Sequence, residues 1–156
     1  MQITFTKVEC TIHYPAIVKD FVCELRPGKH SSKSLFLNFS LSKNLYNITN
    51  DYKLGLIRGS KFENYFTISL DICDALTNVH NNFLLKFITN EIHRLSNIPI
   101  ECPLLANNTY YLKNFEVDSN ILPSYTPTSL EFVSDSMFKA MGRNGMQIKI
   151  TGLVHR

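Results

Sequence analysis

The chain has 156 residues, of which 44% are hydrophobic and 19% are charged. These proportions are typical of a folded domain and exclude an intrinsically disordered chain. The formal net charge of +3 comes from scattered Lys and Arg residues rather than from a run of them, so we expect no nucleic-acid-binding patch. The sequence has no stretch of 18 apolar residues, so no membrane span is expected.

Alternation of apolar and polar residues predicts antiparallel strands that bury one face. In residues 33–41 the apolar face holds Leu35, Leu37 and Phe39, whereas Asn38 lies on a mostly polar face where a glycan could reach water. In chain order, the predicted strands cover residues 3–12, 16–26, 33–41, 62–72, 109–118, 128–138 and 146–154.

Three further patterns complete the predicted elements. Residues 62–72 place Phe62, Phe66, Ile68, Leu70 and Ile72 on one face of a strand. Asn144-Gly145 predicts the turn of the last hairpin, because both residues tolerate positive φ. Residues 81–96 have helical spacing of apolar side chains, with Asn81 or Asn82 as the cap and Pro99 beyond the end. About eight strands and one α-helix around residues 81–96 predict a mainly β fold, a two-sheet antiparallel β-sandwich.

Cysteines and glycosylation sequons favour a secreted glycoprotein. The four cysteines are Cys10, Cys23, Cys73 and Cys102. Their even number fits two disulfide bonds with three possible connectivities, and none has zinc-site spacing. The sequons begin at Asn38, Asn47 and Asn107. The opening residues lack the pattern of a signal peptide, which fits a mature secreted chain or an intracellular one. Paired cysteines with sequons favour the extracellular location.

No pattern in the sequence predicts catalysis. The nucleophile elbow G-x-S-x-G and the metal motif H-E-x-x-H are both missing, and the histidines are scattered. Asp71 and Asp74 flank Cys73 just before the predicted helix, where turn or capping roles suit them better than acid–base chemistry. We therefore predict that the protein is not an enzyme and has no metal site and no cofactor.

The apolar faces allow two interpretations. They can meet in a filled core, or the two sheets can stand apart and hold a lipid-like ligand, because sites for such ligands are mostly apolar with few polar groups. The pattern alone favours the filled core.

An ordered set of motifs resembles a known family. The motifs are FTKVEC, FVCEL, KSLFLNFSLSKNL, YFTISLDICDAL, LSNIPIECPLL and GMQIKITGLV, with a helix between the fourth and the fifth. Together, from about Phe5 to Val154, they resemble a large insect family of small secreted proteins that includes the CheB chemosensory proteins. The positions that match the family's pattern around the helix are Asp71, Cys73, Asn97, Cys102 and Pro103.

This family is similar to the ML lipid-recognition superfamily, which includes the ganglioside activator protein. The resemblance implies an immunoglobulin-like β-sandwich with a lipid-accessible cavity and no catalysis, and the CheB members are linked to taste and pheromone perception. One departure lies in PTSLEF, where Thr128 and Ser129 stand in place of a glycine that family members often carry. This departure is expected to change the loop near Pro127.

The expected protein is therefore a secreted monomer in which residues 1–156 form one ML-like domain. It would bind a small hydrophobic or lipid-like molecule between the sheets, in taste or pheromone perception, with a membrane receptor as a second partner. The alternative is an extracellular interaction module with a solid core that binds a receptor or a glycan through its loops. The expected cavity walls are Leu35, Leu37, Phe39, Phe66, Ile68, Leu70, Phe115, Phe132, Ile148 and Ile150, with Phe83, Phe87 and Ile88 of the helix plugging one end.

This arrangement predicts how the cysteines pair. A Cys73–Cys102 bond would staple the helix-bearing segment back to the sheet. Cys10 and Cys23 would then close a first hairpin across Tyr14-Pro15, because antiparallel neighbours bring Cα atoms to about 5.5 Å.

Overall fold

A computed structural model describes residues 1–77 and 83–155 and shows a mainly β chain. Two helices, α1 (Ile72–Thr77) and α2 (Phe83–Leu95), follow one another between the fifth and sixth strands. Two 3-10 turns cover Lys29–Ser31 and Ser119–Ile121. The strands are β1 (Gln2–Ile12), β2 (Val18–Pro27), β3 (Lys33–Leu41), β4 (Ile48–Arg58), β5 (Lys61–Asp71), β6 (Thr109–Phe115), β7 (Leu130–Ala140) and β8 (Arg143–His155).

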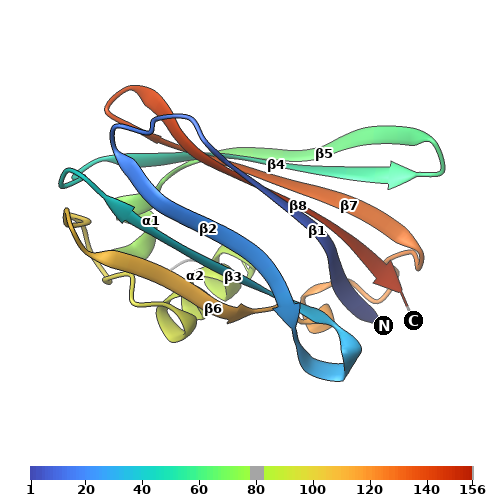
Figure 1. Ribbon diagram of the computed structural model, residues 1–156. Helices are drawn as coiled ribbons and strands as arrows, with labels where there is room; N and C mark the ends of the chain where they lie inside the picture. Colours follow the sequence, from blue (N-terminus) through green and yellow to red (C-terminus); the bar gives the residue numbers. More distant parts are fainter. Residues whose placement is uncertain (78–82, 156) are drawn as a thin grey trace.

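The described strands form two antiparallel sheets, which confirms the predicted two-sheet sandwich. The larger sheet has five strands in the order β1-β8-β7-β4-β5, and the smaller has three in the order β2-β3-β6. Figure 1 shows the two sheets as separate layers, with β1 of the larger sheet beside β2 of the smaller one. No helix of the described residues has the length and apolar character to cross a membrane.

The predicted first hairpin is wrong, although its disulfide is present. β1 pairs with β8 and β2 pairs with β3, so the chain changes sheet between them. At this crossing the amides of Ile17 and Val18 both donate to the carbonyl oxygen of Tyr14. The Cys10–Cys23 bond, with Cα atoms 6.3 Å apart, therefore joins the two layers of the sandwich rather than two neighbours in one sheet.

β4 is a central strand that no predicted element covers. It lies between β7 and β5 in the larger sheet. Its inward positions include Asn50, and Gly55 lies on its outward side. A polar residue on the buried face and a glycine within the strand both weaken the alternation that reveals a strand in a sequence.

A β-bulge in β5 changes the predicted face of one aromatic residue. The register passes from Leu54 opposite Phe66 to Gly55 opposite Asn64, which leaves Tyr65 as the extra residue. Phe62 therefore lies on the opposite face from Phe66, and its ring covers Gly55 at 2.4 Å from where a Cβ would stand. The predicted single apolar face thus holds only from Phe66 onward.

The last hairpin turns earlier than predicted. Ala140 pairs with Arg143, so the turn residues are Met141 and Gly142, with φ of 54° and 73°. The predicted Asn144-Gly145 turn instead lies inside β8, where the register shifts. At this irregularity the carbonyl oxygen of Gly145 accepts hydrogen bonds from the amides of His13 and Tyr14, just after β1 ends.

The main core lies between the smaller sheet and one half of the larger sheet. β1 and β8 supply its larger-sheet side, and β3 and β6 supply much of the other side. Its buried members are Phe5, Ile17, Val18, Leu35, Leu37, Phe39, Leu41, Leu45, Ile48, Leu104, Tyr110, Leu112, Ala140, Met146 and Ile148. The core therefore fills only part of the space that the larger sheet faces.

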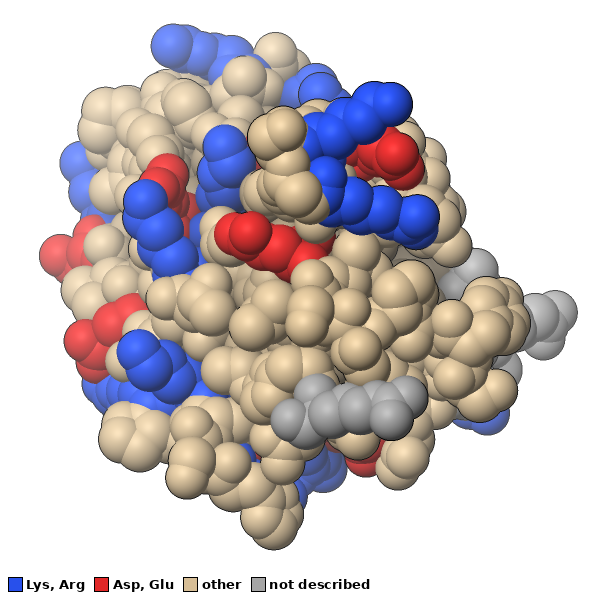
Figure 2. All heavy atoms as spheres, turned by 90° about the vertical axis from the view of Figure 1, so that its right-hand side faces the viewer, with Lys and Arg blue, Asp and Glu red and all other residues tan. Residues whose placement is uncertain are grey.

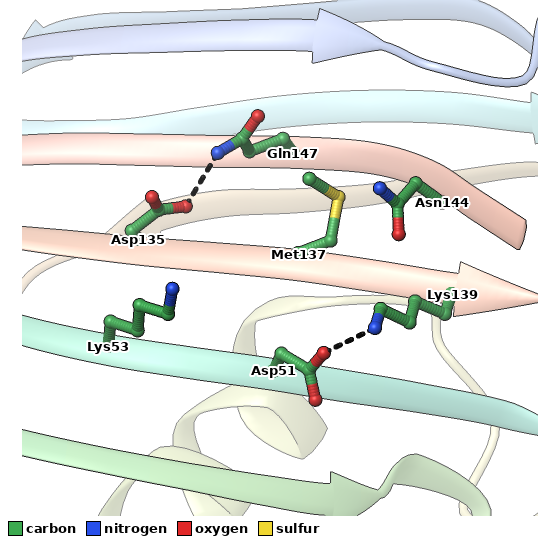
Figure 3. Close-up of a pocket in the computed structure, with 7 residues that line it drawn as sticks. All are labelled: Asp51, Lys53, Asp135, Met137, Lys139, Asn144 and Gln147. Carbon is green, nitrogen blue, oxygen red and sulfur yellow. Dashed lines mark hydrogen bonds and ion pairs between the residues drawn. The ribbon is translucent and has the colours of Figure 1, made fainter.

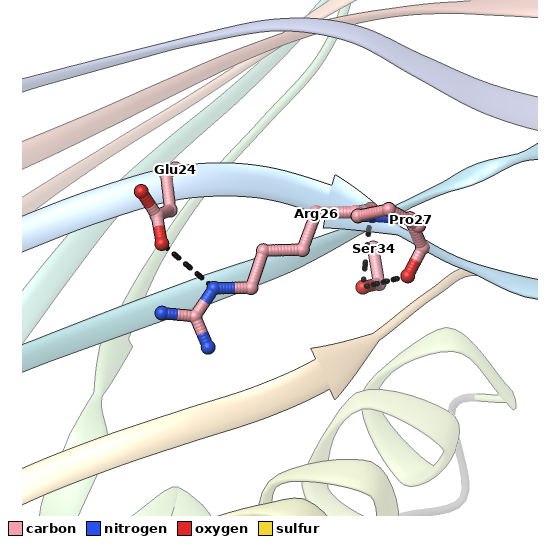
Figure 4. Close-up of polar contacts among 4 residues, drawn as sticks. All are labelled: Glu24, Arg26, Pro27 and Ser34. Carbon is pink, nitrogen blue, oxygen red and sulfur yellow. Dashed lines mark hydrogen bonds and ion pairs between the residues drawn. The ribbon is translucent and has the colours of Figure 1, made fainter.

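The face of β3 that the sequence predicts to be mostly polar is largely buried. Ser34 is 1% exposed and Phe36 is 8% exposed. The guanidinium of Arg26 stands 3.5 Å from the centre of the Phe36 ring, and its Nε donates to the Glu24 carboxylate at 2.7 Å, an ion pair that Figure 4 shows. Asn38 on this face is half-buried, not freely exposed as its position in the sequence predicts.

Candidate functional site

Part of the inner face of the larger sheet is apolar but not filled by the core. The register aligns Tyr52 and Leu54 of β4 with Ile68 and Phe66 of β5, and Leu70 continues the same row. Four of these five side chains are half-buried, and the fifth, Phe66, is 36% exposed. None belongs to the buried core clusters. We refer to Tyr52, Leu54, Phe66, Ile68 and Leu70 as the inter-sheet wedge.

The wedge follows from the unequal widths of the two sheets. Five strands face three, and the smaller sheet packs where β1 lies beside β2 and β3. The far strands β4 and β5 extend beyond this packed region, so their inward side chains meet fewer partners. An apolar surface of this kind gains free energy when another apolar group covers it.

A helical segment connects the free edges of the two sheets at the wedge. The chain leaves the edge strand β5, enters α1 and then α2, and reaches the outer edge of β6. Asp71 caps α1, because its carboxylate accepts the amide of Asp74 at 3.1 Å. The Cys73–Cys102 bond ties the start of α1 to the segment before β6, with Cα atoms 5.5 Å apart.

Asn97 fixes the end of this segment to β6. Its side-chain amide donates to the carbonyl oxygen of Thr109 at 2.8 Å and accepts the amide of Tyr111, also at 2.8 Å. Ser96 forms an isolated bridge with Leu112 beside it. Asn97 therefore takes the place of a neighbouring strand at this edge, and Figure 1 shows α2 alongside β6 and α1 between the ends of β4 and β6.

The apolar face of α2 points toward the sandwich. Phe87 and Ile88 are half-buried, and Ile88 lies seven residues before Leu95, which packs against the main core. Residues at this spacing share one face of a helix. The side chain of Phe83 and the predicted caps Asn81 and Asn82 lie outside the described residues.

Polar side chains interrupt the apolar inner face, among them Ser134, Tyr52 and Asn50. The Ser134 hydroxyl of β7 donates to the Tyr52 phenol oxygen at 2.9 Å. Burial raises the pKa of the Tyr52 phenol above its ordinary value, although the bond from Ser134 opposes the shift. Asn50 is 5% exposed, and its side-chain nitrogen has no hydrogen-bond partner among the described residues.

The predicted cavity-lining residues separate into three groups. Leu35, Leu37, Phe39 and Ile148 are buried in the main core. Phe115, Phe132 and Ile150 are half-buried and pack against that core. Only Phe66, Ile68 and Leu70, together with Phe87 and Ile88 of α2, lie at the incompletely covered side. The predicted set of residues therefore includes both residues of the packed core and residues of the incompletely covered side.

Sequence reasoning missed Tyr52 and Leu54 of the wedge, and the polar residues Asn50 and Ser134 beside it. Asn50, Tyr52 and Leu54 belong to the unpredicted strand, and Ser134 belongs to a predicted strand whose inward polar residue was not singled out. The signal was present as an every-second-residue series at Asn50, Tyr52, Leu54 and Leu56. Reading Asn50 as an inward residue would have revealed both the strand and its buried amide.

The opposite face of the larger sheet has a different character. A pocket of about 200 Å³ on this outer face is lined by charged and amide side chains together with Met137, as Figure 3 shows. Asp51 and Lys139 form a 2.6 Å ion pair, and Gln147 donates to Asp135 at 2.8 Å. Lys139 and Ser69 lower the pKa of Asp51 through hydrogen bonds. Because charged and amide groups make up most of the lining, the pocket suits water better than an apolar ligand.

Within residues 1–77 and 83–155, no three His, Cys, Asp or Glu side chains are grouped in a way that could hold a metal ion. Figure 2 shows one face of the molecule, on which acidic and basic side chains are mixed along the top and left and a broad area of other residues covers the centre and lower right. On that face the charges do not gather into a basic patch.

The cysteines and sequons show a consistent layout. The two disulfide bonds are Cys10–Cys23 and Cys73–Cys102, the two predicted pairs, and no cysteine is free. Asn47 and Asn107 are exposed, whereas Asn38 is half-buried and its side-chain oxygen has no partner among the described residues.

Fold and site together define a disulfide-bonded β-sandwich that has an apolar wedge at one side. The chain belongs to the family described as "Protein of unknown function (DUF1091)", whose model matches residues 37–130. No curated protein matches the chain. Among solved structures, it is similar to chicken MD-1 complexed with lipid IVa, with 11% identity, a TM-score of 0.46 and coverage of 99% of this chain and 98% of that one. It is also similar to a Niemann-Pick type C2 protein from the Japanese carpenter ant, with 14% identity, a TM-score of 0.34 and coverage of 97% and 91%.

Proposed function

We propose that the protein is a secreted, non-enzymatic monomer whose residues 1–156 form one ML-like domain. Its function is to bind a small hydrophobic or lipid-like molecule against the inter-sheet wedge. The observation that carries the proposal is the row of partly uncovered apolar side chains on β4 and β5, away from the filled core. Such a row is costly to leave facing water and becomes favourable when an apolar ligand covers it.

The helical segment supplies the remaining wall of the site. α2 presents Phe87 and Ile88 on the face that also holds Leu95, and this segment runs between the edges of β5 and β6. A ligand between the segment and the wedge would contact apolar groups on both sides. The disulfide at Cys73 and the bonds of Asn97 would hold the two ends of the segment while ligand enters.

The wider role that we propose is extracellular. Two disulfide bonds fit an oxidising compartment, and exposed sequons at Asn47 and Asn107 fit glycosylation there. The resemblance to the CheB proteins supports a role in taste or pheromone perception, with presentation of the ligand to a membrane receptor.

A variant pair tests the binding proposal. Ile68→Asp places a carboxylate in the wedge, whereas Thr67→Asp places the same group on the exposed outer face of the same strand. Because an unpaired charge is costly to bury against an apolar ligand, we expect Ile68→Asp to weaken binding of an apolar fluorescent probe at least about tenfold. Thr67→Asp should change the affinity by less than about twofold. Equal affinities in the two variants would contradict the proposed site.

A further inference from the structure

We infer that Asn50 selects the chemistry of the ligand: a neutral hydrophobic molecule that carries a hydrogen-bond acceptor. This inference rests on the proposed function and assigns a polar contact to the same site. Its starting point is an amide nitrogen that is buried and has no partner among the described residues. A buried donor without a partner is uncommon in proteins because it loses its bond to water and gains nothing in return.

The position of Asn50 places this donor on the ligand side of the sheet. In the register, Asn50 aligns with Leu70 of β5 on one side and with Phe138 of β7 on the other. Leu70 belongs to the inter-sheet wedge, and Tyr52 lies two residues further along the same face of β4. The amide therefore adjoins the row of partly covered apolar side chains, at the end of the sheet where α1 contacts β4.

The surroundings determine which acceptor fits. The Tyr52 phenol and the Ser134 hydroxyl already bond to one another. The inward positions nearest Asn50 on the three strands are otherwise Leu54, Phe66, Ile68, Leu70, Ser136 and Phe138, and none of them is charged. The next inward residue of β5 is Glu63, opposite Leu56, and its negative charge disfavours a carboxylate ligand as well. A carboxylate would lose its hydration here without meeting a cation, whereas an ester or ketone oxygen could accept the Asn50 bond at little cost.

Three probes of similar length separate these requirements: methyl laurate, laurate and tridecane, each delivered from cyclodextrin at pH 8. Displacement of an apolar fluorescent probe gives the affinity of each for the disulfide-bonded full chain. We expect methyl laurate to bind on the order of five- to tenfold more tightly than tridecane, as one additional hydrogen bond allows. Laurate should bind more weakly than its methyl ester.

Two variants assign the preference to Asn50. Asn50→Leu, with Asn50→Ala as a smaller alternative, should bind tridecane at least as well as the wild type and should reduce the ester-to-hydrocarbon ratio to about one. Asn38→Leu is the matched control, because it removes another amide with an unpartnered atom from the outward face of β3. In this control the ratio should stay at the wild-type value.

The outcomes distinguish this inference from the proposed function. If the probes bind but the ratio is the same in the wild type and both Asn50 variants, or if laurate binds best, the inference is wrong and the wedge remains a plain apolar site. If no probe displaces the fluorescent molecule from the wild type, the proposed function fails and the inference fails with it.

Discussion

At the scale of single residues, some non-glycine residues adopt a backbone conformation that their Cβ disfavours. Ser129 has a φ of 61°, directly before β7 begins at Leu130. Thr128 and Ser129 together occupy the stretch where the resemblance to the insect family predicts a glycine. Glycine adopts the left-handed conformation of Ser129 without strain, whereas a residue with a Cβ is strained by about 1–2 kcal/mol there.

Replacing Ser129 by glycine should therefore stabilise the protein. The relief of strain exceeds the entropy that glycine adds to the unfolded chain, so we expect a gain of about 0.5 kcal/mol in the free energy of unfolding. Ser124→Gly is the control, because Ser124 is also exposed but is not among the residues with positive φ. Urea unfolding measures both variants. A loss of stability in Ser129→Gly as large as that in Ser124→Gly would contradict this account of the loop.

At the scale of secondary-structure elements, local patterns predict the strands that bury one face but not the irregularities between them. The alternation in residues 33–41 and 146–154 was enough to place β3 and β8. The bulge at Tyr65 and the turn at Met141-Gly142 were not predictable, because each depends on the partner strand. Asn144-Gly145 is the stronger turn signal in the sequence, yet the register of β8 with β7 assigns it to a bulge.

The edge of β6 offers an element-scale prediction. Asn97→Ala removes both side-chain bonds to the backbone of β6. We expect the free energy of unfolding to fall by about 1–2 kcal/mol and the Tyr111 amide to exchange with solvent faster, since it loses its acceptor. Hydrogen-exchange mass spectrometry of the β6 peptide measures this change.

A comparison with Asn97→Asp separates the two bonds of this clamp. The carboxylate keeps an acceptor for the Tyr111 amide but cannot donate to Thr109, so protection of Tyr111 should largely persist. If exchange at Tyr111 were equally slow in the alanine variant, Asn97 would not be the group that closes this edge.

At the scale of the whole molecule, the sequence predicts the architecture but not the division of the space between the sheets. Cysteine count, alternation and the helix before Cys102 led to the sandwich and its two disulfide bonds. Which apolar residues are core and which are uncovered depends on how far a three-stranded sheet extends across a five-stranded one. Leu37 and Ile68 look alike in the sequence, yet the first is 5% exposed in the core and the second lies in the wedge.

A crystal structure of the protein after incubation with 1-bromododecane tests most directly whether a hydrophobic ligand binds at the wedge. Anomalous scattering would locate the bromine without reference to the rest of the ligand. We predict a bromine peak between α2 and the row formed by Phe66, Ile68 and Leu70. Two results would contradict the central claim: a bromine peak confined to the outer face of the larger sheet, or protein side chains covering the wedge with no bromine peak beside it at saturating ligand.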